Sequence, residues 1–227
     1  MSPANGNPEL LVTVEPDRAQ VLRYLGYPAG ATPDPGVVER VLQVIEDSRG
    51  KLRPRGAYAL YPILHQDPRS LTLGGGATFT GPIGDFLSGA QRVAVFLATA
   101  GPEVVRMAEE AFQARDRLGG LIYNALGSHV AEAVVERILD DLRGRAGPEE
   151  ALTLPYSPGY CGIPLAEQRT VFRLVDARRI GVELLPTLIM KPLKSISGLV
   201  GVGPKGAVAA HGNPCDKCPL PDCHMRR

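Results

Sequence analysis

The sequence contains no tryptophan, and aromatic residues make up only 5% of its 227 positions. A hydrophobic core must therefore be built mostly from Val, Leu, Ile and Ala. No apolar run approaches the roughly 20 residues of a membrane-spanning helix, so we expect no membrane span. The formal net charge is +1, which gives no electrostatic case for binding nucleic acid or an anionic membrane surface. The first residues lack a basic stretch followed by an apolar stretch, so we expect no signal peptide and a cytoplasmic location.

Cysteine is also scarce, but its distribution is uneven. Of four cysteines, three fall at Cys215, Cys218 and Cys223, and the fourth is Cys161. In the cytoplasm thiols stay reduced, so a metal explains clustered cysteines better than disulfides do. The tail therefore predicts an iron–sulfur cluster or a zinc site with Cys161 as the fourth ligand, and His211 or His224 are alternative fourth ligands for zinc. A terminal segment with incidental thiols is the other interpretation.

The remaining composition, 44% hydrophobic and 22% charged, is typical of a globular protein. Helices and strands alternate without regular βαβ order, which predicts an α+β fold with helices packed on a twisted antiparallel or mixed sheet. Residues 1–56 are predicted to be an N-terminal helical segment, 57–203 the α+β core and 204–227 a cysteine-rich tail. Hydrophobic periodicity and turn residues predict helices over 16–26, from about 34, over 102–115, 118–143 and 165–175, and strands over 57–64, 70–73, 78–80, 92–98, 182–190 and 195–202.

Four short motifs occur in a fixed order in the second half of the chain. They are Ser157-Pro-Gly-Tyr160, Ile180-Gly-Val182, Met190-x-Pro192 and Ser195-x-Ser-Gly198. This order resembles the S-adenosylmethionine-binding activation domain of cobalamin-dependent methionine synthase, and the upstream helix around Ala131-Glu-Ala133 is similar to a helix of that family. The resemblance covers roughly residues 90–203, and it is greatest to stand-alone, shortened relatives with a cysteine-rich tail. No single motif is specific, so the order and spacing together carry the resemblance.

The resemblance implies an accessory role in corrinoid methyl transfer. Family domains hold S-adenosylmethionine against the inactive cob(II) form of the corrinoid, and one electron plus the methyl group restores methylcobalamin. Glu132 matches the acidic residue that contacts the amino or ribose groups of the ligand, and Pro158, Gly159 and Tyr160 match the ligand-binding turn. The chain has no Asp-x-His-x-x-Gly motif of its own, so cobalamin must be held by a partner, either a corrinoid-binding protein or a methionine synthase subunit. Without the resemblance, Tyr160 would be interpreted as closing a turn and Glu132 as part of a solvated helix face.

Two departures from the family pattern bear on ligand binding. Pro155 stands where the family has the arginine that pairs with the methionyl carboxylate, and Arg169, Lys191 and Lys194 are candidates to replace it. A later family tyrosine falls among Gly206-Ala-Val-Ala209, where this chain has none. Two other functions therefore stay open. One is a non-catalytic, metal-stabilised module that binds S-adenosylmethionine or a corrinoid, and the other is an iron–sulfur redox carrier on the same scaffold.

Overall fold

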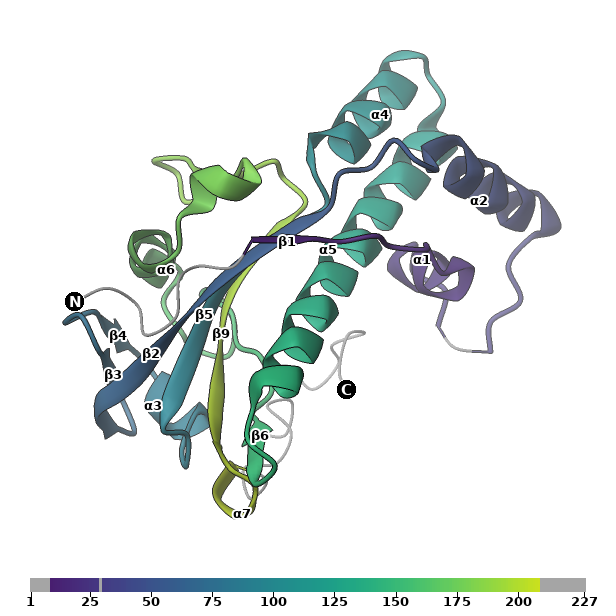
Figure 1. The fold of residues 1–227 in the computed structure, drawn as a ribbon. Helices are drawn as coiled ribbons and strands as arrows, with labels where there is room; N and C mark the ends of the chain where they lie inside the picture. Colours follow the sequence, from purple (N-terminus) through teal and green to yellow (C-terminus); the bar gives the residue numbers. More distant parts are fainter. Residues whose placement is uncertain (1–8, 29, 209–227) are drawn as a thin grey trace.

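The fold is built on one antiparallel sheet. The computed structural model describes residues 9–28 and 30–208 of the chain (Figure 1). Within these residues the strand order is β4-β3-β2-β5-β9-β6, and β1 pairs with β2. All pairings are antiparallel, so the predicted α+β class is confirmed. The strands span Glu9–Leu11 (β1), Arg55–Asp67 (β2), Ser70–Leu73 (β3), Thr78–Thr80 (β4), Arg92–Thr99 (β5), Glu150–Leu152 (β6) and Ser195–Pro204 (β9).

The central strand β5 is apolar on both of its faces. Successive side chains of a strand point to opposite sides of the sheet, and here they fall into two separate clusters. Val93, Val95 and Leu97 belong to one core, whereas Ala94 and Phe96 belong to the other. Both faces of the sheet are therefore covered, which explains why the sequence of β5 is a continuous hydrophobic run rather than an alternating one.

The long helix α5, Arg117–Arg145, covers one face of the sheet with its C-terminal half. Gly56 of β2 allows this close packing, because a Cβ placed on it would lie 2.9 Å from Ile138 Cδ1 and 3.1 Å from Val134 Cγ1. Figure 1 shows α5 lying across the strands and continuing beyond the end of the sheet. The helix predicted over 118–143 is therefore confirmed in its position and length.

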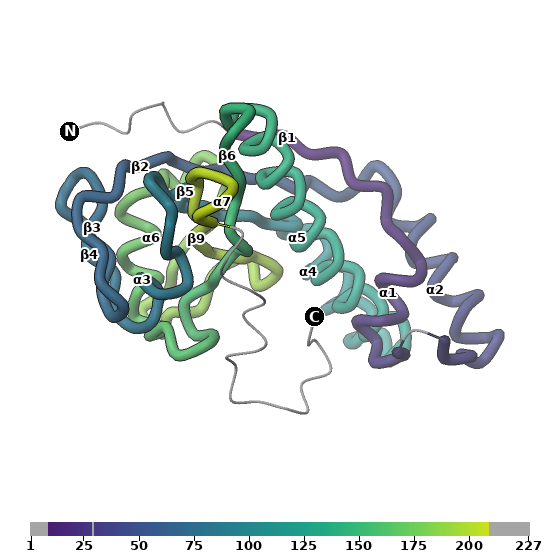
Figure 2. Tube along the Cα trace, turned by 90° about the horizontal axis from the view of Figure 1, so that it is seen from below, coloured from purple at the N-terminus to yellow at the C-terminus, as the bar shows by residue number. Residues whose placement is uncertain are grey.

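The N-terminal half of α5 packs against three further helices. These are α1 (Arg18–Tyr24), α2 (Pro35–Ser48) and α4 (Pro102–Gln113). The side chains of Asp17 and Asp34 cap α1 and α2 by accepting the N–H groups of Gln20 and Gly36. In Figure 2 these helices gather at one end of the molecule, while β3, β4, α3 and α6 lie at the other. The predicted division of the chain at residues 56 and 203 stays a prediction.

Short helices cover the opposite face of the sheet. They are α3 (Ile83–Phe86), η1 (Leu165–Glu167), α6 (Gln168–Leu174) and η2 (Ala177–Ile180). The strand predicted over 182–190 is wrong. That segment contains only β7 (Glu183–Leu184), and β7 pairs with β8 (Met190–Lys191) in a separate two-stranded sheet. Pro186 cannot donate to a ladder and Leu188 has a φ of 67°, so the apolar run turns instead of extending.

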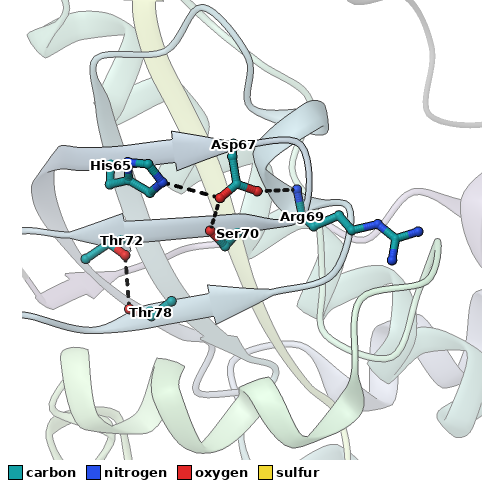
Figure 3. Close-up of polar contacts among 6 residues, drawn as sticks. All are labelled: His65, Asp67, Arg69, Ser70, Thr72 and Thr78. Atoms are coloured by element: carbon teal, nitrogen blue, oxygen red, sulfur yellow. Dashed lines mark hydrogen bonds and ion pairs between the residues drawn. The ribbon is translucent and has the colours of Figure 1, made fainter.

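The turn between β2 and β3 is fixed by one carboxylate (Figure 3). Asp67 accepts hydrogen bonds from the Ser70 hydroxyl at 2.5 Å and from the Arg69 N–H at 2.8 Å. These bonds, that from Ser70 most of all, hold the pKa of Asp67 below its usual value. Further along, the hydroxyls of Thr72 and Thr78 are 3.0 Å apart and join β3 to β4. The hairpin is thereby held in the register that brings the end of β4 beside η1.

The last described element is α7, Lys205–Val208. Among residues 9–28 and 30–208, no helix combines the length and the apolar character needed to cross a bilayer.

Packing of α5 on the sheet predicts a large effect for one substitution. Ile138 is fully buried against Gly56, and Ile138→Ala leaves a cavity, so we expect the free energy of unfolding to fall by about 2–5 kcal/mol. Urea denaturation followed by circular dichroism measures the change. Ile189→Ala is the control, because Ile189 is 51% exposed and a surface change of this kind costs about 0.5 kcal/mol or less. Equal losses in the two variants would contradict this account of the core.

Candidate functional site

Glu132 lies in the wall of an open cavity of about 410 Å³. The cavity is formed by residues 13–15, helix α1 and the outward side of α5. Its lining carries charge of both signs, since it includes Arg23 and Arg137 as well as Glu132 and Glu136.

His129 forms another part of the cavity wall and ties α1 to α5. The Asp17 N–H donates to His129 Nε2 at 3.0 Å, which requires this nitrogen to be unprotonated. Burial lowers the pKa of His129, and the nearby Asp17 carboxylate opposes that shift in part. The neutral imidazole therefore serves as an acceptor at the start of α1 and sets the distance between the two helices.

The second predicted site element, the segment from Ser157 to Gly162, forms a tight turn. The Gly159 N–H donates to the Ile163 carbonyl at 2.9 Å, and the Ile163 N–H donates to the Tyr160 carbonyl at 2.9 Å. Gly159 has a φ of 89° and Cys161 a φ of 51°, both in the left-handed region. Pro158 is buried in this turn, whereas the Tyr160 side chain is 72% exposed. The turn therefore presents Tyr160 to solvent from a fixed base.

Tyr156 anchors the start of this turn to the sheet. Its backbone exchanges two hydrogen bonds with Leu199 of β9, at 2.9 and 2.8 Å. Its ring stacks on Phe86 with centroids 4.6 Å apart and an interplanar angle of 2°. Burial raises the pKa of the Tyr156 hydroxyl to about 12, so this group stays neutral at physiological pH. Tyr156 is a structural support for the turn that carries Tyr160.

The far side of the turn is held by the buried carboxylate of Glu167. It accepts hydrogen bonds from the Thr80 N–H at 2.9 Å, the Thr80 hydroxyl at 2.5 Å and the Thr170 hydroxyl at 3.2 Å. Gly81, directly after β4, packs so closely on this loop that an added Cβ would lie 2.9 Å from Pro164 Cδ. The end of β4 and the turn are thus fixed to one another. The importance of Glu167 is not evident from the sequence, because no motif marks it.

Strand β9 connects the two halves of the site. The even-numbered residues from Lys194 onward bond toward β5; for example, the Ala100 N–H donates to the Lys194 carbonyl. Leu199 and Gly201 bond instead to the segment 153–156 on the other side of the strand. Because peptide groups alternate in direction along a strand, the N–H and C=O of Ser197 also point to the side of β9 on which Leu199 pairs with Tyr156. The Ser197 hydroxyl is buried and has no hydrogen-bond partner. Ser197 is only 2% exposed, so this stretch of β9 is a buried part of the sheet.

Lys194, the residue directly before β9, contacts α5. Its Nζ donates to the Ser128 hydroxyl at 2.9 Å, and Glu132 lies one helical turn after Ser128. The segment that leads to the Tyr160 turn is therefore bonded to β9, and the helix that carries Glu132 contacts the residue directly before β9. The cavity lining itself contains none of Pro158, Gly159 and Tyr160.

The predicted metal site falls mostly outside the part of the chain that the structure describes. Cys215, Cys218 and Cys223, with His211 and His224, are beyond residue 208. Cys161 is half-buried and packs against the core that contains Tyr156. Within residues 9–28 and 30–208, no three His, Cys, Asp or Glu side chains are grouped as metal ligands. The four-cysteine site stays a prediction.

Comparison with known proteins identifies the family. A family model described as "Vitamin B12 dependent methionine synthase, activation domain" matches residues 81–212, which is more than half of the chain. The chain belongs to this family. Activation-domain membership accounts for the sequence resemblance, and the matched range contains both Glu132 and the turn at Tyr160.

One solved structure shares the activation-domain fold. It is described as the MetH reactivation domain bound to AdoHcy, with a TM-score of 0.67 and 18% sequence identity. The alignment covers 88% of this chain and 79% of that one. At this identity the likeness establishes the fold alone. None of the curated proteins matched the chain.

The anchoring role of Glu167 gives a prediction about the turn. Glu167→Ala leaves the buried N–H and hydroxyl of Thr80 without their acceptor, so we expect the free energy of unfolding to fall by about 1–3 kcal/mol. Amide hydrogen exchange over residues 157–164 should become faster, because the turn loses its anchor. Glu183→Ala, at an exposed position on β7, is the matched control. Unchanged exchange in this segment would show that Glu167 does not hold the turn.

Proposed function

We propose that this protein binds S-adenosylmethionine and presents its methyl group to the cobalt of a corrinoid held by a partner protein. The partner is a corrinoid-binding protein or a methionine synthase subunit, and the outcome is reductive reactivation of an inactive corrinoid. Membership of the activation-domain family supports a reactivation role. The related reactivation domain is described as bound to AdoHcy, which supports a ligand of the same class here.

The observation that carries this proposal is the convergence at β9. The strand is bonded to Tyr156, at the base of the Tyr160 turn, and contacts α5 one turn before Glu132. A ligand between these two elements would contact the turn with one end and α5 with the other. The charged residues on α5 fit a molecule with a polar amino-acid portion.

The contribution of this chain is positioning. When bound, S-adenosylmethionine supplies an electrophilic methyl group on a sulfonium centre. Glu132 is assigned to the amino or ribose groups of the ligand, Gly159 allows close backbone approach, and Tyr160 lies beside the ligand. Holding the donor in one orientation converts an encounter between two partners into an aligned transfer. The exposed Tyr160 also places this turn where a partner can approach it.

Binding is tested first, without a partner. We expect isothermal titration calorimetry to detect S-adenosylmethionine binding, and Glu132→Gln to weaken it by about 10- to 100-fold, because a charge-assisted hydrogen bond is lost. Glu109→Gln removes a carboxylate from an exposed position on α4 and should leave the affinity unchanged. Equal affinities for all three proteins would contradict the assignment of Glu132.

The alternative of a non-catalytic binding module is favoured by one observation, the Pro155 that replaces the family arginine. Methylation of cob(II)alamin on a corrinoid protein, with S-adenosylmethionine and a chemical reductant, separates the two functions. Formation of methylcobalamin supports reactivation. Binding without methyl transfer supports the module.

A metal centre is a further part of the proposal. Cys161, Cys215, Cys218 and Cys223 would hold an iron–sulfur cluster or zinc, and a cluster beside Tyr160 suits one-electron chemistry near the corrinoid. Because Cys161 follows Tyr160 directly, the metal would lie next to the proposed ligand site. Clustered reduced thiols also fit the proposed cytoplasmic location.

Anaerobic purification tests the metal centre. We expect bound iron and acid-labile sulfide and an EPR signal on reduction, with Cys161→Ser losing most of the iron. His129→Gln, which leaves every cysteine in place, should retain it. A colourless preparation that contains only zinc would rule out the cluster and the redox-carrier function together.

A further inference from the structure

Lys194 is a half-buried cation with no ionic partner among the residues that the structure describes. No carboxylate of residues 9–28 or 30–208 lies within 4.0 Å of its Nζ. Its Nζ donates a hydrogen bond to the neutral hydroxyl of Ser128. Burial lowers the pKa of Lys194, which means that its surroundings do not compensate the charge. An anion bound beside the ammonium would supply that compensation.

The stem of Lys194 is held in a shaped position. Gly127 of α5 leaves room for it, because a Cβ on Gly127 would lie 2.7 Å from Lys194 Cγ and 3.0 Å from Val104 Cγ1. The carbonyl of Lys194 is bonded to the Ala100 N–H at 2.9 Å, which fixes the backbone. Both the main chain and the stem are thus restrained, and the ammonium is brought to the side of α5 that carries Ser128. A restrained cation loses less entropy on binding an anion than a free surface lysine does.

The position of this ammonium relative to Glu132 is the decisive feature. Ser128 and Glu132 are one turn apart on α5, so their Cβ atoms are about 5–6 Å apart. Lys194 Nζ is 2.9 Å from the first of these side chains. The Lys194 ammonium therefore contacts α5 one helical turn before the residue that carries the Glu132 carboxylate. The α-carboxylate and α-ammonium of an amino acid are attached to one carbon, and their two partners must be neighbours in the same way.

We propose that Lys194 and Glu132 together bind the amino-acid end of S-adenosylmethionine, with Lys194 on the carboxylate and Glu132 on the ammonium. This inference rests on the proposed binding function. Lys194, directly before β9, would take the place of the family arginine, whose position before the turn is occupied by Pro155. Lys191 and Arg169 are exposed and have no comparable support from α5, so they are poorer candidates for this contact.

Two ligands and two variants test the assignment. In the wild-type protein, decarboxylated S-adenosylmethionine should bind about 10- to 100-fold more weakly than S-adenosylmethionine, because one charge-assisted contact is lost. In Lys194→Met, which keeps the apolar stem but removes the charge, we expect the affinity for S-adenosylmethionine to fall by the same factor. The affinity for the decarboxylated ligand should then be nearly unchanged, so that the difference between the two ligands disappears. Lys191→Met is the matched control and should retain the full difference.

The possible results separate this inference from the proposal on which it rests. If wild-type protein binds neither ligand, the binding function fails and the inference fails with it. If wild-type protein discriminates between the ligands and Lys194→Met does so equally well, binding stands and the role of Lys194 is overturned. If the discrimination is lost in Arg23→Met and kept in Lys194→Met, the carboxylate lies in the cavity beside α1, which also overturns the inference. Thermal unfolding of each variant verifies that the fold is retained.

Discussion

The close packing of α5 on the sheet is the constraint on which the rest of the structure depends. Gly56 removes the side chain that would keep the helix away from β2, and Ile138 and Val134 occupy the space. This contact fixes the angle of a 29-residue helix whose other half extends past the sheet. That half organises α1, α2 and α4, and it carries Ser128 to Lys194 and His129 to Asp17. A helix of this length can link a hydrophobic core to a polar site because its own backbone bonds keep it rigid.

Strand β9 is the second element that joins stability and function. One side of it completes the ladder with β5, and the other side pairs with β6 and with the segment leading to Tyr156. Ser197 on this side is only 2% exposed, and the proposed ligand lies between the Tyr160 turn and α5. The residues that would contact such a ligand come from positions widely separated in sequence, and β9 is what brings them together.

The sequence predicted the regular elements well where local patterns are decisive. The continuous apolar run of β5, the helical periodicity of α5 and the Pro102 at the start of α4 each have one physical interpretation. The sequence-based prediction failed where contacts with other parts of the chain decide the exposure of a residue or the formation of a strand. Leu121 belongs to the apolar pattern of α5, yet its side chain is 52% exposed. The short strands β1 and β6 have no strong periodicity of their own and form only because β2 and β9 offer partners.

By itself the sequence determined the α+β class, the family and the order of the motifs, since these follow from patterns along the chain and from residue identities. It did not determine which cation could take over from the missing arginine, because Arg169, Lys191 and Lys194 are equally plausible in one dimension. Only the tertiary structure restrains Lys194, through Gly127 and Ser128, and brings it to α5 one turn before Glu132. It likewise gives Glu167 its partners Thr80 and Thr170. The physical reason is that burial and the distance between charges depend on chain segments far apart in sequence, which local propensities do not encode.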